Sequence, residues 1–432
     1  MLSNFGIILE KKNIENLDKI KKDLTIFPKE NQYVKNIQSV ICYKENENQI
    51  LIPKFYKDYN KDLNTNINIF SPNKLFEFNG NLRKEQEENL NLIVDKLKLD
   101  LRCLYNALTG SGKTVISLKL ISLINRKTLI IVNKLFLLEQ WKEQINKFLG
   151  NVELGFFYGN NINIENKNIV LATIQSISMK EFDKNLFKDF NFVIFDECHH
   201  VPSNIFSKSL FKIGKKLMLG LSATPKRKDG LSQILELHFG DFLISKNTTF
   251  NNDKINVKMV DYSIDIKEKR LYNGLLNIGN LITQISQEKS RTIYFMKIIK
   301  QLYDKNRDIL ILSDRVEHCK IMKEILTINN IECGLFIGGL SKNERKINSE
   351  KKIIIGTYSM ISEGFDIPRL NTLLMITPKT DIIQIVGRIL RKKHEIIPLI
   401  IDVCDSHFQT NIWKMIRLRQ YKELGLNISI KK

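Results

Sequence analysis

The sequence predicts an α/β protein with two tandem domains, each built on a parallel β-sheet, preceded by a small N-terminal α+β domain. From residue 80 onward, short apolar segments of strand length alternate with helical segments, and this alternation occurs twice. Several of these segments are apolar throughout, as expected of parallel strands that helices cover on both faces. A chain of 432 residues also has room for two or three domains.

Residues 1–79 form the predicted N-terminal accessory domain, which is rich in Asn and Lys. A short amphipathic helix is predicted from four apolar residues at near-helical spacing: Ile14, Leu17, Ile20 and Leu24. Val34–Tyr43 and Gln49–Ile52 are predicted to pair as a β-hairpin around the polar turn Glu45–Asn48. The pattern indicates no role for this domain.

The two α/β domains are predicted at residues 80–245 and 246–432. The predicted strands of the first are Arg102–Tyr105, Thr128–Val132, Ile169–Ala172, Phe192–Phe195 and Lys216–Leu221. Those of the second are Ile255–Asp261, Asp308–Ser313, Ile331–Ile337, Lys352–Thr357, Thr372–Ile376 and Leu399–Val403. The polar segment Ser245–Lys254 is the predicted linker.

The charge balance points to a polyanionic partner. Lys and Arg outnumber Asp and Glu by 67 to 47, which gives a net charge of +20 and a pI near 9.5. Such a balance is typical of proteins that bind nucleic acid. The alternative is compositional, because Lys, Asn and Ile are used heavily, as an AT-rich genome would produce.

Cysteine usage and hydropathy indicate a soluble intracellular, cytoplasmic protein. The six cysteines contain no C-x-x-C pair, which argues against a zinc module or a disulfide scaffold. No apolar segment approaches the roughly 18 residues that a membrane span needs, and Met1–Lys12 is too polar for a secretory signal. We therefore expect no membrane partner.

A phosphate-binding loop is predicted at Ala107–Thr114, between a strand and the apolar helix Val115–Leu123. Glycines there let backbone N–H groups surround an anion, and the helix N-terminus adds its dipole. Lys113 is predicted to reach the β- and γ-phosphates and Thr114 to bind Mg²⁺. The strict G-x-x-x-x-G-K-[ST] pattern has Gly where this chain has Ala107. The predicted contacts are Ala107, Leu108, Thr109, Gly110, Ser111, Gly112, Lys113 and Thr114.

Two adjacent carboxylates, Asp196 and Glu197, follow an apolar strand at the edge where α/β proteins bind ligands. Asp196 is predicted to hold Mg²⁺ through water. Glu197 is predicted to position and deprotonate the attacking water. A zinc site at the following Cys198–His200 is disfavoured, because no second ligand cluster accompanies it. With the phosphate loop, these carboxylates predict hydrolysis of a nucleoside triphosphate.

A third cluster lies on one predicted helix of the second domain. Gln384, Arg388 and Arg391 are four and then three residues apart, so they share a helix face. Guanidinium groups suit phosphate oxygens because their fork geometry is fixed and their charge permanent. A solvated basic helix is the alternative, but the surrounding isoleucines indicate a buried helix, and buried arginines need partners. We predict that both arginines complete the nucleotide site when the domains close, as arginine fingers do.

The order and spacing of these motifs resemble those of superfamily 2 helicases over about residues 80–421. The motifs are the DExH box Asp196–His199, Ser222–Pro225, Ser362–Asp366 and Gln384–Arg391. Thr224–Gly230 resembles the T-P-x-R-x-D-G run of XPB-like DNA helicases and phage recombination helicases. Ile52–Tyr56 is similar to the transcript-release DNA helicases of poxviruses and other large DNA viruses. The resemblance implies two RecA-like domains.

The resemblance also implies roles for single residues. Gln86 matches the glutamine that contacts adenine, and Gly364 and Asp366 match positions that line the nucleotide cleft from the second domain. The segment that couples hydrolysis to the nucleic-acid groove corresponds to Ser222, Ala223 and Thr224. The motifs that contact the sugar-phosphate backbone contain Lys134, Thr173, Gln175, Arg315 and Thr357. Such contacts position a strand and carry no sequence information.

The sequence therefore predicts a monomeric ATP- and Mg²⁺-dependent motor that moves along or unwinds nucleic acid, with duplex DNA preferred over RNA. Viral transcription or repair is the expected setting, with transcription or repair proteins as partners and a virion or viral factory as the location in a virus. Two alternatives stay open: a DExH-type RNA helicase, and an ATP-switched clamp or remodeller that separates no strands. A nuclease is disfavoured, because no further carboxylate–lysine cluster stands out.

Overall fold

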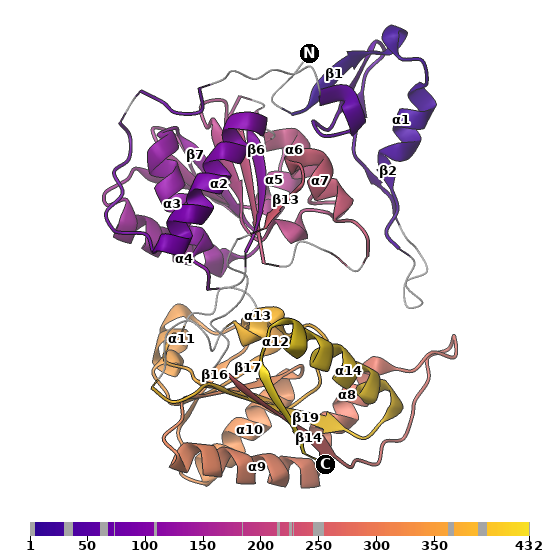
Figure 1. The fold of residues 1–432 in the computed structure, drawn as a ribbon, viewed down its shortest axis with the longest axis vertical. Helices are drawn as coiled ribbons and strands as arrows, with labels where there is room; N and C mark the ends of the chain where they lie inside the picture. The colour runs from indigo at the N-terminus through magenta and orange to yellow at the C-terminus, as the bar shows by residue number, and fades with distance from the viewer. Residues whose placement is uncertain are drawn as a thin grey trace. The chain divides into compact units, whose positions relative to one another are not determined.

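The protein is described by a computed structural model. The structure describes residues 5–29, 38–60, 68–72, 74–107, 110–183, 185–213, 217–223, 227, 229–244, 255–361, 367–387 and 395–431. The chain divides into two compact units, residues 1–248 and 249–432 (Figure 1). The predicted linker, Ser245–Lys254, lies outside the described residues.

The N-terminal part of the first unit contains short strands and one α-helix. Its elements are β1 (Ile7–Glu10), α1 (Leu17–Asp23), β2 (Thr25–Ile26), β3 (Val40–Ile41), β4 (Lys44–Glu45) and β5 (Gln49–Ile52), with 3₁₀ turns at Lys11–Asn13 and Lys57–Asn60. Strands β1, β5 and β4 form one antiparallel sheet, and β2 pairs with β3. Helix α1 confirms the predicted amphipathic helix, and these elements confirm the small α+β region.

The predicted hairpin has a different first strand. Gln49–Ile52 pairs with Lys44–Glu45, whereas Val40–Ile41 pairs with Thr25–Ile26. The side-chain oxygen of Asn46 accepts hydrogen bonds from the backbone N–H groups of Asn48 and Gln49, which closes a tight turn directly after β4. This turn brings β4 rather than β3 beside β5. Residues 34–37 of the predicted strand lie outside the described residues.

The N-terminal elements share a hydrophobic core with the rest of the first unit. Ile7, Leu24 and Ile52 belong to the same buried cluster as Leu129 and Phe195. These N-terminal apolar groups are therefore buried against the large sheet of the unit, which adds to its hydrophobic stabilisation.

An eight-stranded sheet forms the centre of the first unit. Its strands, in spatial order, are β13 (Phe242–Ile244), β6 (Arg102–Asn106), β12 (Leu217–Ser222), β11 (Phe192–Phe195), β7 (Thr128–Val132), β10 (Ile169–Thr173), β8 (Leu154–Tyr158) and β9 (Asn161–Asn163). All neighbours are parallel except β8 and β9. The helices are α2 (Lys84–Asp100), α3 (Lys113–Ile124), α4 (Leu135–Phe148), α5 (Ile174–Met179), α6 (Lys208–Ile213) and α7 (Gln233–Phe239).

A seven-stranded parallel sheet forms the centre of the second unit. Its strands, in spatial order, are β16 (Cys333–Phe336), β17 (Ile353–Thr357), β15 (Ile309–Ser313), β18 (Thr372–Met375), β19 (Leu399–Asp405), β14 (Asn256–Tyr262) and β20 (Asn427–Lys431). The helices are α8 (Ile278–Gln287), α9 (Lys289–Asp304), α10 (Val316–Ile328), α11 (Lys342–Ser349), α12 (Tyr358–Ile361), α13 (Ile383–Val386) and α14 (Phe408–Glu423).

The two sheets confirm the predicted α/β fold class, and each of the eleven predicted strands is present. Four strands were not predicted: β8, β9, β13 and β20. β9, β13 and β20 are edge strands, and β8 lies next to the edge; all four are partly exposed and lack a continuous apolar pattern. Among the described residues, no helix combines the length and hydropathy that crossing a bilayer requires.

Candidate active site

The predicted phosphate loop connects β6 to α3. Gly110 and Gly112 have φ angles of +86° and +92°, in the region that glycine adopts without steric cost. A Cβ atom at position 112 would lie 2.1 Å from Nε2 of Gln86, so a side chain is excluded there by contact as well as by conformation. Leu108 and Thr109 lie outside the described residues.

The residues around this loop fit a phosphate group. Helix α3 begins at Lys113 with no acidic residue in its first turn, so its N-terminal N–H groups and dipole favour an anion. The hydroxyl of Ser111 is buried and has no hydrogen-bond partner among the described residues. Lys113 Nζ donates a hydrogen bond to the carbonyl of Ala107, 3.0 Å away, and Thr114 is the next residue of the helix. Lys113 and Thr114 thus form the first turn of α3, directly after a loop whose residues fit a phosphate group.

Gln86 lies against the same loop. Its side chain is buried, with 7% of its surface exposed. The Oε1 atom accepts a hydrogen bond from the backbone of Arg83, and Nε2 donates to the carbonyl of Ser111 at 3.4 Å. A guanidinium nitrogen of Arg83 donates to that carbonyl at 3.2 Å. Gln86 and Ser111, which are 25 positions apart in the sequence, are therefore in direct contact beside the phosphate loop.

Asp196 lies at the end of β11, in the interior of the site. Its Oδ2 accepts a hydrogen bond from the indole Nε1 of Trp141 at 2.8 Å, and its Oδ1 accepts one from the backbone of Glu197 at 3.0 Å. Burial raises the pKa of Asp196, and the negative charge of Glu197 raises it further, against the hydrogen bond from Trp141 and the charge of Lys113. Lys113 thus lies close enough to Asp196 for its positive charge to lower the pKa of this carboxyl group.

Glu197 has an unusual backbone conformation and a buried carboxylate oxygen with no hydrogen bond from the described residues. Its φ and ψ angles are +47° and +48°, a left-handed conformation that costs a residue other than glycine about 1 kcal/mol. Its Oε2 is buried without a hydrogen-bond partner among the described residues. The Nδ1 atom of His199 is 3.3 Å from this oxygen. A buried carboxylate oxygen in this state is suited to a cation or a water molecule.

The predicted coupling segment lies next to these carboxylates. Ser222 and Ala223 are buried, and Ser222 Oγ is 3.1 Å from His199 Nδ1. The carbonyl of Ser222 accepts a hydrogen bond from the backbone N–H of Ala107, at the start of the phosphate loop. Ser222 therefore links the two halves of the site. Thr224 lies outside the described residues.

Three predicted nucleic-acid contacts lie together in the first unit. Lys134 caps the N-terminus of α4, just after β7, and Thr173 caps α5, at the end of the neighbouring strand β10. Gln175 Nε2 donates to the carbonyl of Asn133 at 2.8 Å, which joins the two segments. Thr173 is mostly buried, and its hydroxyl donates to Ser176. Lys134 and Gln175 are partly exposed.

The other two predicted contacts lie in the second unit. Ser313 at the end of β15 is paired with Thr357 at the end of β17, so Arg315 and Thr357 lie at one edge of this sheet. The guanidinium of Arg315 donates to the carbonyl of Gly279 at 2.7 Å and to the hydroxyl of Thr283 at 3.2 Å. Helix α8 therefore orients Arg315. Thr357 is buried, with 6% of its surface exposed.

Most of the predicted second-unit nucleotide contacts are not described. Gly364, Asp366, Arg388 and Arg391 lie outside the described residues, as does the side chain of Gln384. The backbone of Gln384 belongs to helix α13, in which Ile385 and Val386 are buried. The burial of these two residues agrees with the buried helix predicted for this segment.

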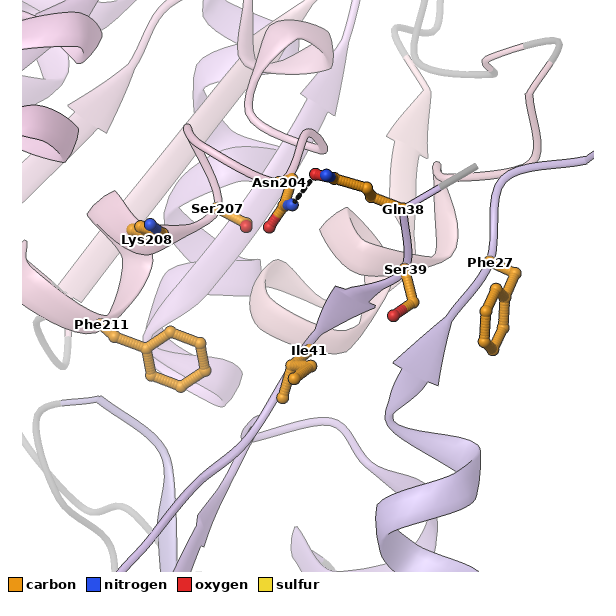
Figure 2. A pocket seen from close by; sticks show the side chains of 8 residues that line it. All are labelled: Phe27, Gln38, Ser39, Ile41, Asn204, Ser207, Lys208 and Phe211. Carbon is orange, nitrogen blue, oxygen red and sulfur yellow. Dashed lines mark hydrogen bonds between the residues drawn. The ribbon is translucent and has the colours of Figure 1, made fainter. Parts of the chain in front are cut away.

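A pocket of about 580 Å³ lies elsewhere in the first unit (Figure 2). Its lining comes from the N-terminal elements and from the segment around α6: Phe27, Gln38, Ser39, Ile41, Asn204, Ser207, Lys208 and Phe211. Gln38 and Asn204 join the two sides by a hydrogen bond of 2.7 Å between their side chains. None of the predicted site residues lines this pocket.

Two known sequence families match the chain. The family described as "Type III restriction enzyme, res subunit" matches residues 79–227. The family described as "Helicase conserved C-terminal domain" matches residues 288–393. The first match contains the phosphate loop and the two carboxylates, and the second contains the Gln384–Arg391 segment.

Similar proteins with helicase names match nearly the whole chain. The "Putative ATP-dependent RNA helicase L396" of Acanthamoeba polyphaga mimivirus is 33% identical over 432 residues, covering 94% of this chain and 81% of the relative. The chain belongs to the superfamily 2 helicases. The two α/β sheets agree with the two RecA-like domains expected of this family, and the protein is an ATP-hydrolysing helicase that binds nucleic acid.

Other similar proteins connect this helicase to viral and XPB-type proteins. The "Putative helicase 161L" of Invertebrate iridescent virus 6 is 28% identical, covering 86% of this chain and 88% of the relative. The "DNA 3'-5' translocase XPB2" of Sulfurisphaera tokodaii is 33% identical over 171 residues, or 39% of this chain and 38% of the relative. Among solved structures, T4 UvsW matches with 19% identity and a TM-score of 0.33, covering 88% of this chain and 81% of that one.

Two residues near the site of this helicase were not predicted to act there. Trp141 binds Asp196, and Arg83 binds the phosphate loop through Ser111. Trp141 lies on α4 and is 2% exposed. A single buried tryptophan on an apolar helix face carries no signal of such a contact, because its partner is 55 residues away.

Proposed function

We propose that this helicase uses Mg²⁺-dependent ATP hydrolysis to move along duplex DNA and to separate its strands. The observation that carries the proposal is the juxtaposition of Lys113, Asp196 and Glu197 beside a glycine loop that fits phosphate. Lys113 binds the β- and γ-phosphates, and Gln86 contacts the adenine from beside the loop. Thr114 and Asp196 are the proposed ligands of Mg²⁺, which when bound would neutralise charge on the phosphate oxygens.

Glu197 is the proposed general base. Its backbone is in the left-handed conformation directly after β11, and its Oε2 has no hydrogen-bond partner among the described residues, with His199 Nδ1 3.3 Å away. That oxygen is therefore able to accept a proton from a water molecule that attacks the γ-phosphate. The proton would come from the water, and the departing group would be ADP.

The second unit is proposed to supply the remaining nucleotide contacts. Gly364 and Asp366 would line the nucleotide cleft, and Gln384, Arg388 and Arg391 would face the γ-phosphate. The arginines would stabilise the charge that develops there during transfer to water. Hydrolysis would be coupled to the nucleic-acid groove through the segment Ser222, Ala223 and Thr224. This division follows the proposed domains, 1–79, 80–245 and 246–432.

Nucleic acid is proposed to bind along the strand ends that carry Lys134, Thr173, Gln175, Arg315 and Thr357. DNA as the substrate is supported by the similarity to XPB2, whose name describes a DNA translocase; that this DNA is duplex is part of the proposal. RNA remains the second candidate, because L396 is named an RNA helicase. Because two of the similar proteins are viral helicases, we propose a viral setting for this helicase, in transcription or repair. We further propose that it acts as a monomer.

The test is a comparison of ATPase rates on one protein preparation with duplex DNA, single-stranded DNA and RNA, together with strand-displacement assays on DNA and RNA duplexes. We expect duplex DNA to stimulate hydrolysis most and DNA strands to be displaced. Stimulation by RNA alone, with displacement of RNA duplexes, would replace the DNA proposal by the RNA one. Stimulation without displacement of either duplex would favour a translocase or clamp. Lys113→Ala protein measures any contaminating activity.

A further inference from the structure

The segment Ile264–Asn277, between β14 and α8, forms an ordered hairpin (Figure 1). Arg270 and Leu276 pair as an antiparallel bridge, and the N–H of Asn277 donates to the carbonyl of Lys269 at 2.8 Å. Closer to the tip, the N–H of Leu271 donates to the carbonyl of Leu275 at 2.7 Å. Gly274, with φ of +79°, completes the turn.

The base of the hairpin is fixed to the second unit at three points. Gln284 on α8 forms two hydrogen bonds with the backbone of Lys267, of 3.1 and 2.8 Å. The hydroxyl of Ser406 accepts a hydrogen bond from the backbone of Ile264. His407 Nε2 lies 3.2 Å from a carboxylate oxygen of Glu268. These contacts hold the hairpin in a defined direction.

The tip presents an aromatic ring to solvent. Tyr272 is fully exposed, with a relative surface of 111%, and it occupies the second position of the Leu271–Gly274 turn. A tyrosine ring offers a large apolar face and a polar hydroxyl, so at this turn it is available for contact with a binding partner. Lys267 and Lys269 are exposed on the arm that leads to it. Arg270 is paired with Glu268 at 3.0 Å.

The hairpin rises from the sheet edge that carries the proposed nucleic-acid contacts. It begins after the carboxyl end of β14, and Arg315 and Thr357 follow the carboxyl ends of parallel strands in the same sheet. Helix α8 contacts both the hairpin and Arg315. Its Gln284 binds the backbone of Lys267 in the hairpin. Its Gly279 and Thr283 accept hydrogen bonds from the guanidinium of Arg315. A nucleic-acid strand that contacts Arg315, as proposed above, would therefore lie on the side of the sheet from which the hairpin extends.

We propose that Tyr272 stacks on an unpaired base of the nucleic acid bound to the second unit, while Lys267 and Lys269 contact the adjacent phosphates. The inference rests on the proposed function for the presence of that strand. An aromatic ring stacks on any base because each base has a π-face, so this contact is tolerant of sequence. A protein surface is the competing occupant, and the test below separates the two.

The test measures the affinity for a DNA duplex with a fluorescent single-stranded tail and for the same duplex with blunt ends. We expect Tyr272→Ala to weaken binding to the tailed duplex about tenfold, as loss of one stacked base does. Binding to the blunt duplex should change less than twofold. Tyr272→Trp should bind the tailed duplex as wild type does. The matched control is Ile328→Ala, because Ile328 is 80% exposed and ends α10, at the opposite edge of the sheet.

Salt dependence separates stacking from charge. Lys267→Ala and Lys269→Ala should each reduce the slope of log affinity against log salt by about 0.7, the value for one phosphate on a single strand. Tyr272→Ala should lower the affinity and leave the slope unchanged. Equal binding of the tailed duplex by Tyr272→Ala and wild type would overturn the proposal and favour a protein partner for the tip. Failure of any nucleic acid to stimulate the wild-type ATPase would instead overturn the proposed function.

Discussion

The two units differ in the partners of their carboxylates that are shielded from water. In the first unit, Asp196 is hydrogen-bonded to a neutral indole, and Glu197 keeps one buried oxygen without a hydrogen-bond partner among the described residues. Burial raises the pKa of Asp196, and the neighbouring Glu197 raises it further. Two neighbouring carboxylates that are largely removed from water are costly, because their charges repel and their hydration is reduced.

In the second unit, each of two buried carboxylates faces an arginine. Arg291 binds Asp405 through two nitrogens, at 2.6 and 3.0 Å, and also donates to the carbonyl of Ile376. Arg417 Nε donates to Asp402 at 2.7 Å. Burial alone would lower the pKa of Arg417, but the charge and hydrogen bond of Asp402 raise it on balance. These charges are neutralised within the protein.

This difference distinguishes carboxylates that stabilise the fold from carboxylates that are available to bind a ligand. A carboxylate that a neighbouring guanidinium neutralises has no need of a ligand, whereas the first-unit pair gains from an added cation. This difference supports our proposal of Asp196 and Glu197 as the catalytic carboxylates, and the paired carboxylates of the second unit should support folding. Five experiments with substituted proteins test this difference.

The largest effect is expected from Lys113→Ala. This change removes the only ammonium group on the described part of the phosphate loop, and ATP hydrolysis should fall to background. The backbone that binds phosphate is unchanged, so circular dichroism and the unfolding midpoint should match wild type. Normal turnover by the folded variant would remove the nucleotide site from this loop.

Arg388→Ala and Arg391→Ala are expected to reduce nucleic-acid-stimulated hydrolysis by about 10³–10⁵-fold, the contribution of an arginine finger. ATP affinity should stay within about tenfold, or roughly 1.4 kcal/mol, because Lys113 and the loop remain. Lysine at either position should restore little, since it lacks the planar fork. Nucleotide affinity and stimulated rate are measured on the same folded variants. Wild-type rates in both alanine variants would contradict a role for the second unit in hydrolysis.

Glu197→Gln is expected to lower hydrolysis by about 10²–10⁴-fold, the usual contribution of a general base. ATP should still bind, because Lys113, Thr114 and Asp196 are intact. Equilibrium binding of a fluorescent ATP analogue and single-turnover hydrolysis measure the two effects separately. A variant that binds ATP normally and hydrolyses it within a few-fold of wild type would show that Glu197 is not the base.

Arg291→Met is expected to destabilise the second unit by about 3–5 kcal/mol, because Asp405 would remain buried without its partner. Replacing both residues, as Arg291→Met with Asp405→Leu, should recover most of the loss. Trp413 is one of two tryptophans, so in a Trp141→Phe background its fluorescence follows urea unfolding of this unit. If the single and double variants were equally stable, the ion pair would not be a structural element.

The smallest effect is expected from Trp141→Phe, which keeps an aromatic ring in the buried position and removes the hydrogen bond to Asp196. Groups that orient a metal ligand typically contribute about 10–100-fold to metal affinity or activity. We expect the Mg²⁺ concentration for half-maximal ATPase to rise by about tenfold. Trp413→Phe is the control, since Trp413 lies on α14 in the second unit. An unchanged Mg²⁺ requirement would mean that Trp141 only fills space.

The sequence determined the features that depend on residues close together along the chain. Apolar segments of strand length predicted the central strands of both sheets, because a parallel strand is apolar on both faces. The glycines, Lys113 and Thr114 predicted a phosphate loop, and Asp196 with Glu197 predicted a carboxylate pair at a strand end. Each of these patterns carries its own chemistry within a few residues, so no knowledge of the fold was needed.

Tertiary structure decided which distant residues meet. The strand order β6–β12–β11–β7 brings Lys113, Ser222 and Asp196 together, and no local pattern encodes that order. The contacts of Trp141 with Asp196 and of Gln86 with the Gly112 loop follow from the same packing. The strands β8, β9, β13 and β20 and the partner of β5 also escaped prediction, because partial exposure and a tight turn override the apolar pattern at those positions.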